Sequence, residues 1–239
     1  MQKATVEEIR ARFDRDVERF SNLETGQSST MDAALALDLI ADAAAATTPA
    51  AVSMLDIGCG AGNFSLRVLQ RLPRAAVTLV DLSRPMLNRA VSRVTGAGGT
   101  VSQAIQGDIR EIDLPPASQD VVLAGAVLHH LRDDGQWLDV FTKVFNALRP
   151  GGSFWIFDLV ESEIPAVREV MWDRYRQYLT NLNGVDYCRE VLAYIDHEDS
   201  PRPLGYQMRM LRRVGFWHVD VLHKTACFAA FGAMRDGVV

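Results

Sequence analysis

The chain has 239 residues, of which 48% are hydrophobic and 23% charged, enough to bury one large core or two modest ones. Its formal net charge of -5 gives it no general attraction for nucleic acid, which argues against a dedicated nucleic-acid-binding protein. The three cysteines are too widely spaced for a disulfide framework or a paired-cysteine zinc site, so no metal is expected.

The beginning of the chain is charged and contains no apolar segment typical of a secretion signal. No apolar run approaches the roughly 20 residues that a membrane-spanning helix needs. We therefore expect a cytoplasmic protein without membrane contact. The oligomeric state is left open, a homodimer included.

Two amphipathic helices are predicted first. Apolar residues recur at three- and four-residue spacing from Val6 to Phe20 and again from Met31 to Ile40, with a polar break over residues 21–30. An alanine-rich stretch over residues 43–51 would end the second helix and lead into the core. Residues 1–50 are thus predicted to form an N-terminal helical cap.

The chain then alternates short apolar runs with amphipathic segments. The apolar runs are nearly continuous, as buried parallel strands require, and they cover residues 52–57, 77–81, 101–106, 120–126 and 153–158. One intervening helix is predicted to begin at Ser83, with Pro85 in its first turn, and another covers residues 133–148. This alternation predicts a doubly wound α/β sheet.

After Asp158 the pattern changes to consecutive helices, predicted over residues 163–182, 190–195 and 204–214. We interpret residues 161–205 as a helical insertion. The last apolar stretch, residues 216–233, predicts two strands joined by a short turn, so one edge of the sheet should be antiparallel. The core then comprises residues 51–160 and 206–239 of a single compact domain.

Three alternate glycines, Gly58, Gly60 and Gly62, follow the first core strand, where open α/β sheets bind ligands. A dinucleotide-binding fingerprint would need a glycine at the position of Asn63. A phosphate-binding Walker loop would need Gly-Lys-Ser/Thr, which is absent. The glycines therefore indicate a ligand site, and the two commonest phosphate-binding loops do not match it.

Two acidic residues narrow the ligand. Asp56 precedes the first glycine by two residues, and it would repel a pyrophosphate but suit an ammonium group. Asp81 follows Gly62 by nineteen residues, at a strand end where a carboxylate can accept hydrogen bonds from both ribose hydroxyls. A nucleoside without phosphate and with a cationic tail is predicted, and S-adenosylmethionine is the common metabolite that fits.

The ordered series "LDIGCGAG", "LVDLS", "GDIREI", "DVVLAGAVLHHL" and "LRPGGSFWIFD" resembles class I S-adenosylmethionine-dependent methyltransferases over about residues 52–159. The resemblance implies a Rossmann-like seven-stranded sheet with an antiparallel last strand, and S-adenosylhomocysteine as product. It implies that the glycine loop, with Cys59 as a small filler, surrounds the methionine part of the cofactor. The other implied cofactor contacts are Asp81 with ribose, Leu82 with the adenine face, Asp108 and Ile109 with the adenine amino edge, and Ala124 and Gly125 with the amino-acid end.

Methyl transfer is a displacement at an already activated carbon, so the protein mainly positions the acceptor and excludes water. If the acceptor must lose a proton, His129, His130 and Asp158 are the candidates near the ligand end of the sheet. Alternatively, one histidine packs beneath the loop, the other faces solvent, and Asp158 caps the next helix.

Aromatic residues from both ends of the chain could cover the site. Phe13 and Phe20 could lie over the cofactor, because aromatic rings attract a sulfonium, although their helical spacing equally fits core packing. The inserted helices carry Trp172, Tyr175, Tyr178 and Tyr187, which could form a pocket for an apolar or planar acceptor or simply a hydrophobic seam.

The predicted function is methyl transfer to a small-molecule acceptor. The segments "FDRDVERF" and "LRRVGFWHVDVL" are also distantly similar to carboxy-S-adenosylmethionine synthase, a relative serving tRNA modification, which needs an arginine such as Arg189 or Arg202 for the added carboxylate. Arg209, Arg212 and Arg213 could instead bind RNA, but a solvated helix face explains them as well. A NAD-dependent oxidoreductase, which Asn63 argues against, and a non-catalytic cofactor-binding module are the remaining alternatives.

Overall fold

The structure, a computed structural model, describes residues 3–21 and 28–237 and contains a seven-stranded sheet of order β3-β2-β1-β4-β5-β7-β6. Its strands are β1 Ser53–Ile57, β2 Ala76–Asp81, β3 Thr100–Gln106, β4 Gln119–Gly125, β5 Leu148–Leu159, β6 His218–Thr225 and β7 Phe228–Met234. Strands β1 to β5 are parallel, whereas β7 runs antiparallel to β5 and β6. The predicted sheet, including its terminal hairpin and antiparallel strand, is confirmed.

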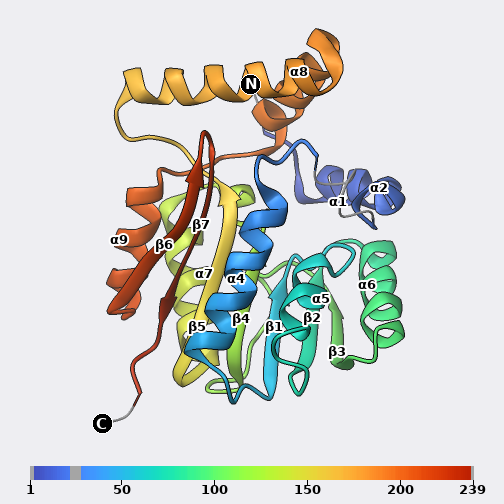
Figure 1. Cartoon of the computed structure of the whole chain (residues 1–239), viewed down its shortest axis with the longest axis vertical. Helices are drawn as coiled ribbons and strands as arrows, with labels where there is room; N and C mark the ends of the chain where they lie inside the picture. Colours follow the sequence, from blue (N-terminus) through green and yellow to red (C-terminus); the bar gives the residue numbers. More distant parts are fainter. Residues whose placement is uncertain (1–2, 22–27, 238–239) are drawn as a thin grey trace.

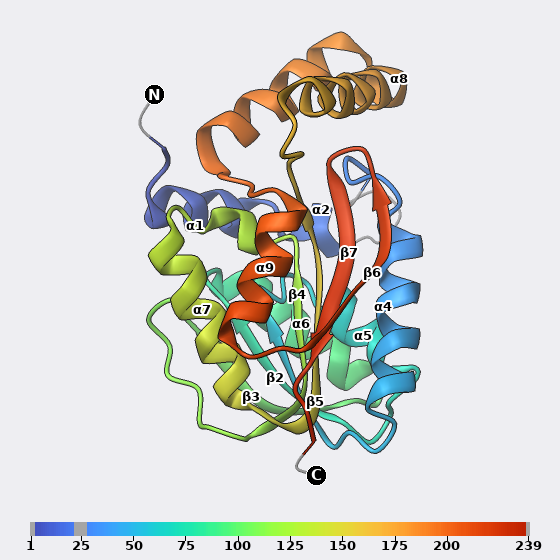
Figure 2. The same cartoon turned by 90° about the vertical axis from the view of Figure 1, so that its left-hand side faces the viewer.

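Helices cover both faces of the sheet (Figure 2). One face carries α4 Ala33–Thr47, α5 Asn63–Leu69 and α6 Arg84–Gly96, and the other carries α7 Asp134–Ala147 and α9 Leu204–Val214. Successive strand residues alternate between the two cores, so Met54 packs on the first face and Leu55 on the second. Burial on both sides explains the nearly continuous apolar strands.

The first predicted helix divides into α1 Val6–Arg15 and α2 Val17–Ser21. It divides at Asp16, whose backbone N–H donates to the Phe13 carbonyl 3.1 Å away. Most of the predicted polar break, residues 22–27, lies outside the described residues. Both helices lie beyond the carboxyl ends of the parallel strands, as does α8 Pro165–Glu198 (Figure 1).

The prediction of two separate helices over residues 163–182 and 190–195 is wrong about their extent. Helical residues run through α8 and are interrupted only at Asn183, with φ -154°, and Gly184, with φ 88°. Glycine adopts this left-handed conformation without steric cost, so the helix bends there and resumes at once. Although α8 is long, no helix among the described residues has an apolar stretch able to cross a membrane.

Strand β5 also begins earlier than predicted, at Leu148 instead of residue 153. Its first residue already pairs with Gln119 of β4, before the register between the strands shifts. Residues 149–152, which follow the helix predicted over residues 133–148, are therefore part of the extended segment that enters the sheet.

Candidate functional site

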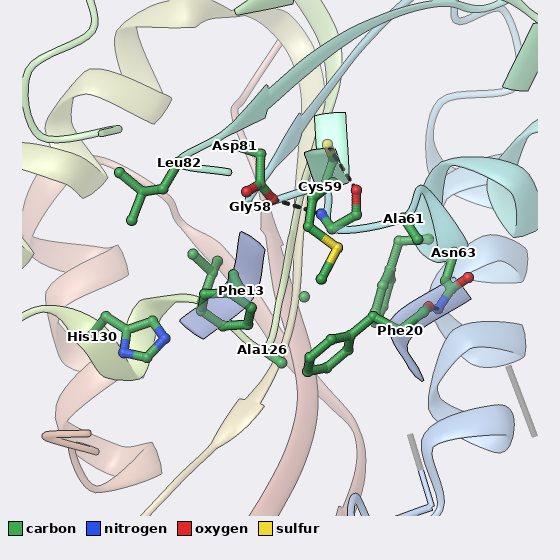
Figure 3. A pocket seen from close by; sticks show the side chains of 15 residues that line it. Phe13, Phe20, Gly58, Cys59, Ala61, Asn63, Asp81, Leu82, Ala126 and His130 are labelled. Carbon is green, nitrogen blue, oxygen red and sulfur yellow. Dashed lines mark hydrogen bonds between the residues drawn. The ribbon is translucent and has the colours of Figure 1, made fainter. Parts of the chain in front are cut away.

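Three adjoining cavities lie at the carboxyl ends of β1, β2 and β4, where the order of the sheet reverses and α/β folds bind ligands. The first cavity, of about 700 Å³, lies between the glycine loop and helices α1 and α2 (Figure 3). The third, of about 480 Å³, shares Asp81, Leu82 and His130 with it. The second, of about 650 Å³, shares Phe13 and Phe20 with the first.

The three glycines of the loop have different structural roles. Gly58 has φ +64°, and a Cβ there would come within 2.5 Å of the Val127 side chain. Gly62 precedes α5 with φ +83°, against Ala90. Gly60 has φ +51° and nothing within 4 Å of its missing Cβ, and it borders the first cavity. Gly58 and Gly62 thus set the backbone, while Gly60 leaves open space for a ligand.

Asp56 is buried behind this loop. Its carboxylate is 1% exposed and accepts hydrogen bonds from the Ser65 backbone N–H at 3.2 Å and hydroxyl at 2.5 Å. It borders none of the three cavities. Burial raises its pKa to about 7. In this position the residue holds the first turn of α5 in place, and its contact with an ammonium group stays a prediction.

Asp81 faces the first and third cavities from the end of β2. Its two oxygens accept hydrogen bonds from the backbone N–H groups of Gly60 and Ser83, both at 2.8 Å, and Figure 3 shows the bond to Gly60. Burial raises the pKa of Asp81 to about 6, so the group is ionised at neutral pH. A carboxylate offers about four acceptor positions, which leaves room for two ligand hydroxyls.

The third cavity is bordered by both residues predicted at the adenine edge, Asp108 and Ile109, and by Leu82. Although burial raises the pKa of Asp108, hydrogen bonds and charge from Arg110 outweigh burial and hold it below its usual value. Val6 and Ile9 of α1 add apolar walls. The cavity is therefore a mainly apolar slot bordered also by the carboxylates of Asp81 and Asp108 and by Arg110.

His129 faces the second cavity in a buried group of carboxylates. Its backbone N–H donates to Asp158 at 3.0 Å, and its ring Nδ1 bonds the other oxygen of that carboxylate. Its Nε2 lies 3.6 Å from Asp199. Burial lowers the pKa of His129, but the charges of Asp199 and Asp158 outweigh burial and raise it to about 9.

His130 turns the other way and borders the first and third cavities. Its Nδ1 lies 3.2 Å from Asp199, and burial together with the charge of His129 lowers its pKa. Neither histidine faces open solvent as the alternative interpretation required. Sequence reasoning missed Asp199, because it follows α8 in a polar turn with no motif to mark it.

The boundary between the first and second cavities is formed by Phe13, Phe20 and Ala126. The two phenyl rings lie 5.6 Å apart. Ala126 has φ 53°, a strained conformation for a residue with a Cβ, and its N–H donates to the Phe157 carbonyl at 2.7 Å. Such strain persists only where the surrounding structure holds the backbone in place.

Of the remaining predicted residues, some line the first cavity and others are buried away from it. Gly125 borders the first cavity, and a Cβ there would overlap the Phe64 ring. Ala124 is fully buried within β4 and borders none of the three cavities. Cys59 borders the first cavity, but burial raises its pKa well above the ordinary value, so it is no thiolate nucleophile.

These shifted groups predict how stability depends on pH. Asp56 and Asp81 have folded pKa values above the unfolded 3.8, so their contribution is lost as pH rises from about 4 to about 7. His129 contributes fully below its unfolded value of 6.5 and loses this contribution through pH 9. The pKa of His130 is lowered, so its contribution to stability is lost as pH falls below the unfolded value of 6.5. The pKa of Asp199 is also lowered, so its contribution is lost only when pH falls below the unfolded value of 3.8.

We therefore expect the melting temperature of the ligand-free protein to be highest near pH 4 and to fall steadily to about pH 9. Each fully titrating group changes the free energy of unfolding by up to about 1.4 kcal/mol per pH unit. Scanning calorimetry across this range measures the slope, and Asp56→Asn should flatten it below pH 7. A melting temperature that rises from pH 5 to 9 would contradict the assignment.

Comparisons with known proteins show which families the sequence resembles. Residues 54–152 match the model of the methyltransferase domain family. The chain is 33% identical over 119 residues to an uncharacterized methyltransferase of Mycobacterium tuberculosis, covering 50% of this chain and 55% of the relative. It is 30% identical over 207 residues to the carboxy-S-adenosyl-L-methionine synthase of Wolinella succinogenes, covering 84% of both chains.

The fold itself matches solved structures. The human N-acetylserotonin methyltransferase, solved in complex with S-adenosylmethionine, aligns with a TM-score of 0.60 at 19% identity, covering 96% of this chain and 57% of that one. An O-methyltransferase family protein from Burkholderia thailandensis aligns with a TM-score of 0.67 at 16% identity, covering 96% and 63%. The chain thus spans little more than half the length of several proteins it matches.

Proposed function

Because this chain belongs to the class I S-adenosylmethionine-dependent methyltransferases, we propose that it transfers the methyl group of S-adenosylmethionine to a small-molecule acceptor. The observation that carries the proposal is the meeting of two cavities at Phe13, Phe20 and Ala126. A cofactor in one cavity and an acceptor in the other would present the methyl carbon and the nucleophile to each other at this boundary.

The first and third cavities fit the cofactor. The apolar slot beside Leu82 and Asp108 suits adenine, the free acceptor positions of Asp81 suit the ribose hydroxyls, and the open space at Gly60 suits the methionine part. When bound, the cofactor supplies an activated methyl carbon on a sulfonium. Phe13 and Phe20 would face that cation with their rings and help exclude water.

The second cavity fits an acceptor that must lose a proton. Asp158 holds Nδ1 of His129, which leaves Nε2 as the atom able to take the acceptor proton. The backbone bond from His129 to the same carboxylate fixes the ring further. We assign His129 as general base and Asp158 as its positioning residue, while His130 contacts the cofactor.

A carboxy-S-adenosylmethionine synthase is the second candidate, supported by the likeness to the Wolinella succinogenes protein. Neither Arg189 nor Arg202 borders the cavities at the cofactor, and they pair with Asp186 and Asp134. Arg12 borders the second cavity, but Glu198 already holds its guanidinium at 2.7 Å. Arg19, 3.8 Å from Asp16, is the better candidate for an added carboxylate.

Mass spectrometry of the ligand extracted from purified protein tests the two functions. We expect to extract S-adenosylmethionine or S-adenosylhomocysteine, at nearly one molecule per protein chain, from both the wild type and the Arg19→Gln variant. A carboxylated cofactor that is retained by the wild type and lost from Arg19→Gln would favour the synthase. Calorimetric titration with NAD provides the control, because binding of NAD in preference to S-adenosylhomocysteine would overturn the methyltransferase proposal.

A further inference from the structure

We infer that His129, His130 and Asp199 together form a binding site for one divalent transition-metal ion, for which zinc is the best match. The cysteine spacing predicted no metal, but this group contains no cysteine, and only the fold brings its members together. One nitrogen of each histidine and a carboxylate oxygen of Asp199 lie within 4.8 Å of one another. The site itself is independent of the proposed function, whereas its effect on turnover rests on that function.

The distances among these atoms match those of ligands that share one ion. Oδ1 of Asp199 lies 3.2 Å from Nδ1 of His130 and 3.6 Å from Nε2 of His129. Zinc bonds to nitrogen and oxygen at about 2.0–2.2 Å, so two ligand atoms of a tetrahedral site lie about 3.3 Å apart. Asp199 therefore needs little movement to bind the same ion as either histidine, and a small rotation of one ring brings the two nitrogens together.

Two of the three ligand atoms are buried and have no hydrogen-bond partner within the described ranges. They are Oδ1 of Asp199 and Nδ1 of His130. Asp199 is only 3% exposed, and burial of a polar atom without a partner is costly. The 3.6 Å between Asp199 and Nε2 of His129 is also too long for a hydrogen bond. One ion among the three atoms would satisfy all of them.

The surroundings hold His129 in the orientation that a metal ligand needs. Asp158 bonds Nδ1 of the ring, so Nδ1 carries the proton and Nε2 presents its lone pair. Histidines that bind metals usually donate their other ring N–H to a carboxylate or carbonyl in this way. The backbone N–H of Ser200 donates to the His129 carbonyl at 2.7 Å, which holds Asp199 beside the ring.

The charge and the chemical type of the ligands favour a divalent transition metal. Asp158 and Asp199 are buried carboxylates, and neither forms an ion pair with an arginine or lysine among the described residues. The nearby Arg12 is paired with Glu198, and Arg132 donates to backbone carbonyls. A dication balances two such carboxylates. Two imidazoles and one carboxylate suit zinc, whereas magnesium and calcium prefer oxygen ligands alone.

A zinc ion at this site would inhibit the proposed reaction. It would take the lone pair of Nε2 of His129, the atom assigned to accept the acceptor proton. His129 and Asp199 both border the second cavity, which leaves room there for a fourth ligand such as water. We expect saturating zinc to lower turnover by at least about 100-fold, and EDTA to restore it. The pH behaviour expected of His129 belongs to the zinc-free protein.

Calorimetric titration of EDTA-treated protein with zinc chloride tests the site. We expect one zinc ion per chain with a dissociation constant below about 1 μM, and much weaker binding of magnesium chloride. His130→Gln and Asp199→Asn each remove a ligand and should weaken zinc binding by at least about 100-fold, whereas Asp158→Asn should weaken it by about 10- to 100-fold. In nuclear magnetic resonance spectra of the histidine ring nitrogens, zinc should shift Nε2 of His129 and Nδ1 of His130.

His223→Gln provides the matched control, because His223 also lies beside a carboxylate, 2.9 Å from Asp32, but belongs to no such three-ligand group in the described part of the chain. Its zinc affinity should equal that of the wild type. The inference is overturned if zinc binds no tighter than magnesium, if the site variants bind zinc as the wild type does, or if saturating zinc leaves turnover unchanged. Titration of zinc-free protein with S-adenosylhomocysteine separates the two proposals, because its failure would overturn the methyltransferase function and leave the metal site intact.

Discussion

Replacing Asp81 with alanine is expected to weaken the binding of S-adenosylhomocysteine by at least about 100-fold. The carboxylate is ionised at neutral pH and borders both cofactor cavities, so it can accept charge-assisted hydrogen bonds from two ribose hydroxyls. Each such bond contributes about 1.5–3 kcal/mol. Isothermal titration calorimetry measures the loss directly, and the thermal stabilisation of the protein by the ligand should disappear with it.

Two companion variants make this result specific. Asp81→Asn keeps one acceptor oxygen without the charge and should fall between the wild type and the alanine variant. Asp113→Ala removes an exposed carboxylate that borders none of the three cofactor and acceptor cavities, and it should bind normally. Because Asp81 also holds two backbone N–H groups, circular dichroism must accompany each titration. Normal affinity in a folded Asp81→Ala protein would remove the ribose assignment.

Replacing His129 with alanine is expected to lower turnover by about 100- to 10,000-fold while changing the affinity for S-adenosylhomocysteine by less than about twofold. The ring borders the acceptor cavity and not the first or third cavity. His130→Gln should show the opposite pattern, with a higher KM for the cofactor and a smaller loss of turnover. Steady-state kinetics with an acceptor found by screening metabolite pools for methyl acceptance separates the two.

The pH profile provides an independent readout. The base form of His129 forms as pH rises through its pKa of about 9, so wild-type turnover should increase between pH 7 and pH 9. Asp158→Asn removes a carboxylate that raises this pKa, and it should move the rise to lower pH. Normal turnover in His129→Ala would mean that catalysis here depends on positioning alone.

Local pattern in the sequence was enough to predict most of the fold. The alternation of apolar runs and amphipathic helices predicted the parallel strands, because burial on both faces forces nearly continuous apolar residues. The glycine spacing and Asp81 predicted the ligand site for a similar reason, since a tight turn and a strand end place these residues together within one βαβ unit.

Local pattern does not show where a side chain points. Asp56 stands beside the glycines in sequence, but Ser65 of the following helix satisfies its carboxylate away from the cavity. The first predicted helix was taken as continuous because its apolar periodicity runs through the break at Asp16. In α8 the predicted gap over residues 183–189 was too long, because only Asn183 and Gly184 leave helical geometry.

Only the tertiary structure shows that the two histidines have different surroundings. In sequence, His129 and His130 are equivalent neighbours. In the fold, a short 3-10 turn directs one ring to Asp158 of β5 and the other toward the cofactor cavities, with Asp199 from the end of α8 between them. Residues from three distant segments set the charge of His129. The sequence by itself predicted the strands, the glycine turn and the position of Asp81, because these depend on short-range geometry. Which groups meet the acceptor depends on long-range packing, and only the assembled fold fixes it.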